Sequence, residues 1–319
     1  MGGTVPNPDQ LGRLCPCQIE IGAWLPSPRT TATPRWPEHR PMLVTTGYGL
    51  VVANSNEPTS PDFLASDHLL AATLAERTGQ ILLDLRASLV ADGAATDELK
   101  AHGDRTAHEF IMGALAELRP GDAAFSEEGI ADESDDARGR RVSVSRVWVI
   151  DPLDGTREFG EPERGDWAVH VAMCVDGLPV VGAVALPAMG LVLSTAQPPR
   201  LPDVDPSRET APRIVVSRSR PPSEATVIRD ALDGELVTMG SAGAKAMAVV
   251  RGEVDIYPHS GGQYEWDNCA PAAVALAAGL VATRLDGSPL IYNRPDPYLP
   301  DLLICRREWA TSVATALGH

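Results

Sequence analysis

The chain has little cysteine, few aromatic residues and no surplus of positive charge. Five cysteines in 319 residues are an odd number scattered along the chain, which excludes the dense, even disulfide framework of a small secreted domain. Cys15 and Cys17 have no second pair or histidine cluster after them, so they do not make a zinc site. We therefore expect a protein of a reducing cytoplasm.

Basic residues are outnumbered, with 27 against 43 acidic residues and a net charge of -16. This balance opposes binding to nucleic acid or to an anionic membrane through any unshielded surface. A small anionic ligand would need a positive site that is built locally. Aromatic residues make up 5% of the chain, and none stands out as a stacking partner for a nucleobase. Nothing in the sequence indicates an oligomeric state.

Long hydrophobic runs without helix breakers are also lacking. The longest uncharged run, Gly177–Pro199, could span a bilayer by length but contains Pro179, Gly182, Pro187 and Gly190. It predicts two buried strands and a turn. The chain does not open with a basic segment, an apolar core and a small-residue cleavage site, so we expect a soluble protein without a secretory signal.

Residues 1–60 lack the periodicity of a folded segment. They hold nine prolines, and their four arginines balance four acidic residues. Such sequence cannot bury enough apolar surface to offset the entropy lost on ordering. We predict a tail that is either disordered or precedes the true start at a residue such as Met42, and whose removal spares activity and stability.

Organised sequence predicts an N-terminal α+β domain over residues 61–205. Ser66 is a plausible N-cap, and the apolar residues after it recur at helical spacing to about Ser88. A second helix is expected over residues 105–118. Short β-type runs follow at 147–150, 167–175, 180–186 and 191–194.

A polar, proline-rich linker over residues 196–212 suggests a boundary. After it strands and helices alternate, which predicts a C-terminal α/β substrate domain over residues 206–319. The expected strands are 214–217, 236–239, 254–257 and 302–305, and the expected helices are 223–232, 243–250 and 267–278.

Carboxylates gather where the predicted elements begin or end. Asp104 opens a predicted helix, Glu127 stands beside Glu128, and Asp267 opens another helix. Asp151 follows a strand; Pro152 disfavours helix there and Gly155 permits a tight turn, so Asp151 and Asp154 can converge. Hard oxygen ligands at one point suit Mg²⁺.

Each carboxylate also has a simpler explanation. Asp-Pro and Asp-Gly are common turn dipeptides, and Glu127 lies in an acidic segment that solvent alone could stabilise. Asp104 and Asp267 could be helix caps. The joint arrangement in four separate segments favours a metal site over these alternatives.

Three motifs in this order carry a family resemblance: Ser126-Glu-Glu128, Val149-Ile-Asp-Pro-Leu-Asp-Gly-Thr156 and Glu265-Trp-Asp267. They resemble the lithium-sensitive, magnesium-dependent inositol monophosphatase superfamily, over about residues 66–309. Arg157-Glu-Phe159 and Gly240-Ser-Ala-Gly-Ala-Lys245 look more like its 3'(2'),5'-bisphosphate nucleotidase branch. The branch members that dephosphorylate 3'-phosphoadenosine 5'-phosphate are the closest likeness.

The resemblance implies an α+β fold, an inositol monophosphatase-like αβαβα layered sandwich. It implies two or three Mg²⁺ ions held by Glu127, Asp151, the carbonyl of Leu153, Asp154 and Asp267. Asp104 and Thr156 match the pair that orients and deprotonates the attacking water. Substrate contacts are expected at Gly155, Ser217, Arg218, Ser241 and Lys245.

Two basic residues of the expected substrate domain, Arg220 and Lys245, are unusual for their positions. Arg220 stands where the family's Ser/Thr-Arg-Ser-His segment has its histidine, which departs from the pattern. Lys245 is one of two lysines in a chain with 25 arginines, and we expect it at an exposed helical position. A lysine in a chain that otherwise uses arginine is either a point charge for a second phosphate or a plain surface residue.

The chemistry expected is removal of the 3'-phosphate of 3'-phosphoadenosine 5'-phosphate, or of its sulfated form, by water activated at the metals. Bound cations would let an acidic protein bind a polyanion. Inositol monophosphatase and fructose 1,6-bisphosphatase activities are alternatives, and a catalytically silent nucleotide or cation binder is an alternative of another class. An aspartyl-phosphate route is disfavoured because Asp151 and Asp154 are three residues apart, not two.

Overall fold

The computed structural model describes residues 61–203 and 211–319, with side chains from Ser66 onward. The predicted tail, residues 1–60, lies outside the described residues. In the described part of the chain, no helix combines the length and apolar character that a membrane crossing requires.

The first sheet has the strand order β1-β2-β3-β4-β5. Its strands are β1 (Ala123–Ser126), β2 (Arg146–Asp154), β3 (Ala168–Val175), β4 (Leu178–Leu186) and β5 (Leu191–Ser194). Only β1 and β2 pair in parallel among these five. Nearly every residue of β2 and β3 is buried, as expected for strands that are covered on both faces of the sheet.

The second sheet has the order β7-β6-β8-β10-β9. Its strands are β6 (Arg213–Ser217), β7 (Glu235–Met239), β8 (Ile256–Tyr264), β9 (Val281–Thr283) and β10 (Tyr298–Cys305). Strand β6 pairs in parallel with β7 and β8, whereas β10 is antiparallel to both of its neighbours.

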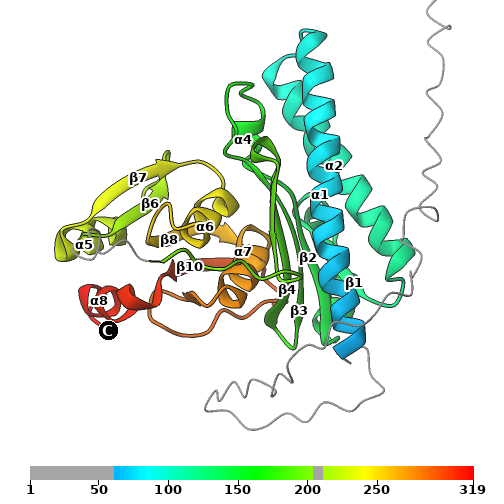
Figure 1. Cartoon of the computed structure of the whole chain (residues 1–319). Helices are drawn as coiled ribbons and strands as arrows, with labels where there is room; N and C mark the ends of the chain where they lie inside the picture. The colour runs from blue at the N-terminus through cyan, green and yellow to red at the C-terminus, as the bar shows by residue number, and fades with distance from the viewer. Residues whose placement is uncertain (1–60, 204–210) are drawn as a thin grey trace, which may run out of the picture. The chain divides into compact units, whose positions relative to one another are not determined.

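Helices separate and cover the two sheets (Figure 1). Helices α1 (Pro61–Ala91) and α2 (Thr96–Leu118) cover one face of the first sheet. Helices α6 (Ala242–Val250) and α7 (Glu265–Ala277) fill the space between the sheets, and α5 (Ser223–Leu232) and α8 (Arg307–Leu317) cover the second sheet. The short segments are η3 (Glu127–Asp132), α3 (Asp135–Val142), α4 (Thr156–Phe159) and η4 (Pro187–Met189). The αβαβα layering is confirmed.

One hydrophobic cluster joins the two sheets through the middle helices. It contains Val149 and Val184 from the first sheet, Val274 from α7, and Leu302 and Ile304 from the second sheet. Gly182 of β4 permits this contact, since a Cβ there would lie 2.7 Å from the Ala270 carbonyl oxygen of α7. The predicted division at residue 205 coincides with the change of sheet but stays a prediction, because this core belongs to both parts.

The structure corrects the expected starts of the first two helices. Helix α1 begins at Pro61, so Ser66 lies inside it, and its hydroxyl accepts a hydrogen bond from Arg119 (3.0 Å) instead of capping the helix. Helix α2 begins at Thr96, so Asp104 lies in its interior. Gly103, directly before the expected helix cap Asp104, lies within the helix and is required by packing, because a Cβ would lie 2.7 Å from the Phe159 ring.

Strand β2 also extends beyond its expected end. It runs to Asp154, so Asp151 lies within the strand and the prediction of a strand end there is wrong. The pairing register with β3 shifts between Asp151 and Asp154, where Pro152 cannot donate a ladder hydrogen bond. Gly155 then adopts φ +89°, the left-handed turn conformation expected for it.

Candidate functional site

Three aspartates from two elements converge beside the first sheet. Asp151 and Asp154 come from the irregular end of β2, and Asp267 comes from the first turn of α7. One carboxylate oxygen of each lies within 4.8 Å of the others. The predicted convergence of these three side chains is therefore present.

Glu127, the first residue of η3, adds a fourth carboxyl group. It lies in hydrogen-bonding contact with Asp151, although its oxygens are outside the three-aspartate cluster. Burial, followed by the charge of Asp267, raises the pKa of Glu127 to about 8. Burial and the charge of Asp154 raise the pKa of Asp267 to about 7, and burial with Glu127 raises that of Asp151. Carboxylates this close together repel one another when they are ionised, and a bound cation would offset that repulsion.

The donor set fits a hard divalent cation. Carboxylate oxygens from Glu127, Asp151, Asp154 and Asp267 are the ligand type that Mg²⁺ prefers. The expected backbone ligand, the Leu153 carbonyl, lies in the same turn and is 3.1 Å from the Thr156 hydroxyl, which donates toward it. A metal site here is consistent with the geometry.

Asp154 differs from its neighbours because protein donors surround it. Its carboxylate accepts hydrogen bonds from Ser241 Oγ (2.5 Å), the Ala242 amide (3.0 Å) and the Gly243 amide (2.6 Å) at the start of α6. Burial alone would raise its pKa, but His170, Lys245 and Ser241 lower it to about 2. Asp154 therefore remains ionised and joins β2 to the first turn of α6.

His170 was missed by the sequence reasoning. It lies fully buried in β3, donates from Nδ1 to the Trp266 carbonyl (3.1 Å), and has Nε2 3.2 Å from Asp154 Oδ2. It thus contacts both the residue before Asp267 and Asp154. The sequence offered one signal for His170, a single histidine within an apolar strand.

Asp104 and Thr156 meet beside the carboxylate cluster, as predicted for this pair. Thr156 Oγ1 is 3.2 Å from Asp104 Oδ1, and its single proton is shared between this carboxylate and the Leu153 carbonyl. Burial and the charge of Glu128 raise the pKa of Asp104 to about 7, although the Thr156 hydrogen bond opposes this. A half-buried carboxylate with this pKa can exchange a proton near neutrality.

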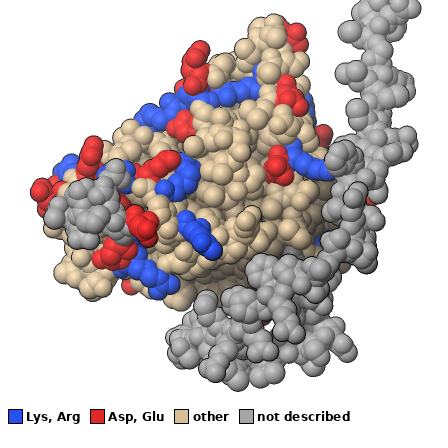
Figure 2. Space-filling view, in the orientation of Figure 1, with Lys and Arg blue, Asp and Glu red and all other residues tan. Residues whose placement is uncertain are grey.

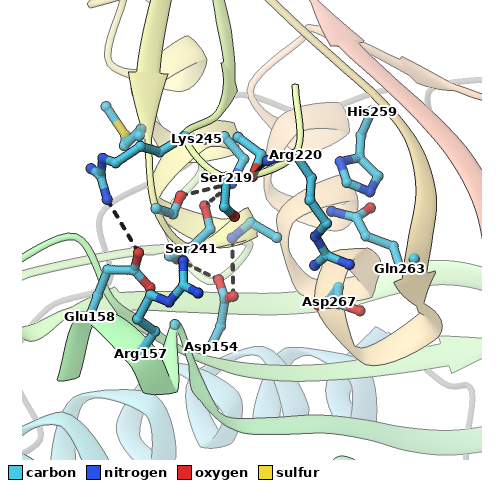
Figure 3. Close-up of a pocket in the computed structure, with 17 residues that line it drawn as sticks. Asp154, Arg157, Glu158, Ser219, Arg220, Ser241, Lys245, His259, Gln263 and Asp267 are labelled. Carbon is cyan, nitrogen blue, oxygen red and sulfur yellow. Dashed lines mark hydrogen bonds and ion pairs between the residues drawn. The ribbon is translucent and has the colours of Figure 1, made fainter. Parts of the chain in front are cut away.

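A pocket of about 460 Å³ adjoins Asp154 and Asp267 (Figure 3). The residues expected to contact substrate all line it: Gly155, Ser217, Arg218, Ser241 and Lys245. Other lining residues include Arg157, Glu158, Arg220, His259 and Gln263. Basic and acidic side chains are scattered over the visible face of the molecule (Figure 2). The pocket itself brings together four basic residues, Arg157, Arg218, Arg220 and Lys245.

Lys245 is not exposed, contrary to expectation. Its side chain is buried with 5% relative exposure, and its ammonium group donates to the carbonyls of Gly240 (2.7 Å) and Ser241 (2.6 Å). Burial lowers its pKa to about 8 despite nearby carboxylates. The buried position arises because α6 lies between the two sheets and is buried along its whole length.

Asp166 contacts two residues that line the pocket, Arg218 and Gly240, and was also missed. It accepts hydrogen bonds from Arg218 Nη2 (2.9 Å), the Gly240 amide (2.7 Å) and Arg164 Nη2. Arg218 is also 3.3 Å from Glu158 Oε1. Asp166 therefore fixes Arg218 and the turn before α6 relative to each other.

The described geometry agrees with comparisons to known proteins. The model of the inositol monophosphatase family matches residues 66–317. The chain belongs to this family. A relative from Mycobacterium bovis, 3'-phosphoadenosine 5'-phosphate phosphatase, is 48% identical over 252 residues, which cover 75% of this chain and 89% of the relative. The expected family membership is confirmed.

Two further members of the family extend the comparison. The 3'(2'),5'-bisphosphate nucleotidase CysQ of Escherichia coli is 31% identical over 205 residues, 61% of this chain and 80% of that protein. The crystal structure of CysQ from Bacteroides thetaiotaomicron has a TM-score of 0.64 at 26% identity, and the match covers 76% of this chain and 98% of that one. The fold and the branch of the family that the motifs favoured are both supported.

Proposed function

We propose that this protein hydrolyses the 3'-phosphate ester of 3'-phosphoadenosine 5'-phosphate, and also of its sulfated form. The observation that carries the proposal is the Asp104–Thr156 contact beside the carboxylate cluster, in a chain 48% identical to a phosphatase named for that substrate. Retention of this pair disfavours a silent binder, because a cation or nucleotide site alone does not require it.

Two or three Mg²⁺ ions complete the proposed site. Glu127, Asp151, the Leu153 carbonyl, Asp154 and Asp267 would hold them. When bound, the ions neutralise the phosphate dianion and lower the pKa of water. Lithium inhibition is expected for a member of this family.

The protein's own groups supply orientation and proton transfer. Asp104 accepts the proton of the attacking water, since a base works best with a pKa close to the working pH. The Thr156 hydroxyl, between Asp104 and Leu153, keeps this carboxylate in position. Arg218 and Ser241, in the pocket wall, are proposed to contact the substrate together with Gly155, Ser217 and Lys245.

A specificity profile tests the proposal. We would measure kcat/KM for adenosine 3',5'-bisphosphate, its sulfated form, an inositol monophosphate and fructose 1,6-bisphosphate at one free Mg²⁺ concentration. The first two should be preferred, and excess chelator should abolish turnover. Preference for inositol phosphate or fructose bisphosphate would replace the proposed substrate, and full turnover in chelator would contradict the metal-dependent reaction.

A further inference from the structure

The basic side chains of the pocket differ in how far the protein itself satisfies them. Arg218 is 3.3 Å from Glu158 Oε1 and 2.9 Å from Asp166 Oδ2, so two carboxylates share its charge. Lys245 donates to two backbone carbonyls. Both side chains are thereby held mainly by protein acceptors.

Arg220 is different. Among residues 66–203 and 211–319, no carboxylate lies within ion-pairing distance of its guanidinium, while its backbone amide donates to Ser217 Oγ (3.3 Å). Figure 3 shows the side chain extending into the pocket toward Gln263 and Asp267. Its charge also helps to lower the pKa of His259 to about 4, after burial and Lys245.

The backbone of β8 provides a place for this guanidinium. A Cβ on Gly262 would lie 2.8 Å from Arg220 Nη1, so the end of the Arg220 side chain lies directly against this glycine. Gly262 has φ +76°, a conformation that other residues adopt only with strain. The guanidinium of Arg220 therefore lies against the backbone of β8 and has no neutralising carboxylate among the described residues.

We propose that Arg220 binds the phosphate group of the substrate that is not hydrolysed, the 5'-phosphate of the nucleotide. The inference rests on the proposed function. A planar guanidinium can donate two parallel hydrogen bonds to a phosphate. A second phosphate needs a positive partner here, because the carboxylate of Glu158, which is not among the proposed metal ligands, lines the same pocket and would repel it.

The alternative cation in the pocket is Arg157. It belongs to the first turn of α4, and Figure 3 shows it beside Asp154 and Glu158, on the other side of the pocket from Gln263. Each arginine has one aspartate of the carboxylate cluster nearby, but Arg157 also lies beside the carboxylate of Glu158, whereas the other neighbour of Arg220 is the neutral Gln263. The second phosphate is therefore assigned to Arg220.

The test compares a bisphosphate with a monophosphate. Arg220→Ala should lower kcat/KM for adenosine 3',5'-bisphosphate by about 10- to 100-fold, mainly through KM, as expected for loss of a charged hydrogen bond. For adenosine 3'-monophosphate the change should be less than about 3-fold. Arg220→Lys should restore part of the lost kcat/KM, because lysine keeps the positive charge but cannot donate the two parallel hydrogen bonds of a guanidinium. Arg140→Ala removes an exposed arginine outside the pocket and is the charge control.

Binding without turnover gives an independent readout. Adenosine 5'-monophosphate carries only the phosphate assigned to Arg220, so calorimetry should show weaker binding to Arg220→Ala by a similar factor. Adenosine should bind both proteins equally.

The outcomes separate this inference from the proposed function. Equal losses for both substrates would place Arg220 at the reacting phosphate, and no loss would remove it from the site. A selective loss in Arg157→Ala with none in Arg220→Ala would move the second phosphate to Arg157. Each of these overturns the inference although the enzyme remains a nucleotidase. A wild-type protein that hydrolyses neither nucleotide contradicts the proposed function itself.

Discussion

Asp104 is half-buried and Asp151 is buried near the same centre, and their surroundings assign them different roles. Asp104 contacts a hydroxyl group, whereas Asp151 belongs to the aspartate cluster. Asp104→Asn preserves size and removes the charge, so kcat should fall about 100- to 10,000-fold with a smaller change in KM. Asp151→Asn should instead weaken magnesium affinity, as measured by calorimetry.

A magnesium titration distinguishes the two roles. Excess Mg²⁺ should partly restore Asp151→Asn and leave Asp104→Asn impaired. Thr156→Ser, which retains the hydroxyl group, is the matched control for the contact with Asp104 and should stay near wild-type activity. Full recovery of Asp104→Asn at high Mg²⁺ would show that Asp104 is principally a ligand, and another base would be needed.

His259 predicts a pH dependence of stability. Burial, with the charges of Lys245 and Arg220, lowers its pKa to about 4, although Gly261 and Asp301 oppose the shift. An unfolded histidine titrates near about 6.5, so between these values the unfolded chain binds more protons and stability falls as pH decreases. Relative to His259→Asn, the wild type should lose up to about 3 kcal/mol of unfolding free energy between about pH 6.5 and 4.

Urea denaturation of both proteins at several pH values checks this sign. The difference between the two free energies should be constant above about pH 7.5, where histidine is neutral in both states. A difference that does not vary with pH would mean that His259 titrates normally in the folded protein.

At the residue scale, the sequence predicted the aspartates better than their surroundings. Motif order and spacing indicated Asp151, Asp154 and Asp267, and all three meet. His170 and Asp166 carry no such signal, because their contacts depend on how distant segments pack. The exposure of Lys245 was predicted wrongly for the same reason.

At the element scale, periodicity located most helices but not all their ends. Helix α5 spans the predicted residues 223–232, since a single apolar face and a polar loop on each side define it. Helix α2 was predicted too short because Asp104, directly after Gly103, indicates the start of a helix. Helix α8 and strands β1 and β9 were missed; both strands are short and have few residues to show a pattern.

Two glycines of α2 give a matched test of whether Gly103 is required by packing. A Cβ on Gly103 would lie within 2.8 Å of both Phe159 and Leu153, whereas a Cβ on Gly113 would contact nothing within 4 Å. Gly113→Ala should stabilise the protein by up to about 1 kcal/mol through helix propensity. Gly103→Ala gains the same propensity but should be net destabilising, because overpacking costs about 1–3 kcal/mol. Urea melts of both variants decide the matter, and equal stabilisation would refute the packing role of Gly103.

At the scale of the whole molecule, the central core favours unfolding as one unit. The cluster that contains Val149, Val274 and Ile304 involves both sheets and the helix between them. If either sheet unfolded alone, the apolar face of α7 that it covers would be exposed to water, which is unfavourable. The division at residue 205 would then describe the chain's topology and not two independently stable domains.

Substitutions in the outermost layers test this cooperativity. Leu82 lies in α1 on the outer face of the first sheet and Ile228 lies in α5 on the outer face of the second, and both are fully buried. Leu82→Ala and Ile228→Ala should each cost about 2–5 kcal/mol. In a single cooperative unit, either change lowers the protection of both β3 and β10 against hydrogen exchange by the same free energy, measured by mass spectrometry at several urea concentrations. If Leu82→Ala weakens β3 and spares β10, while Ile228→Ala does the reverse, the two sheets belong to separate folding units and the predicted boundary at residue 205 is energetic as well as topological.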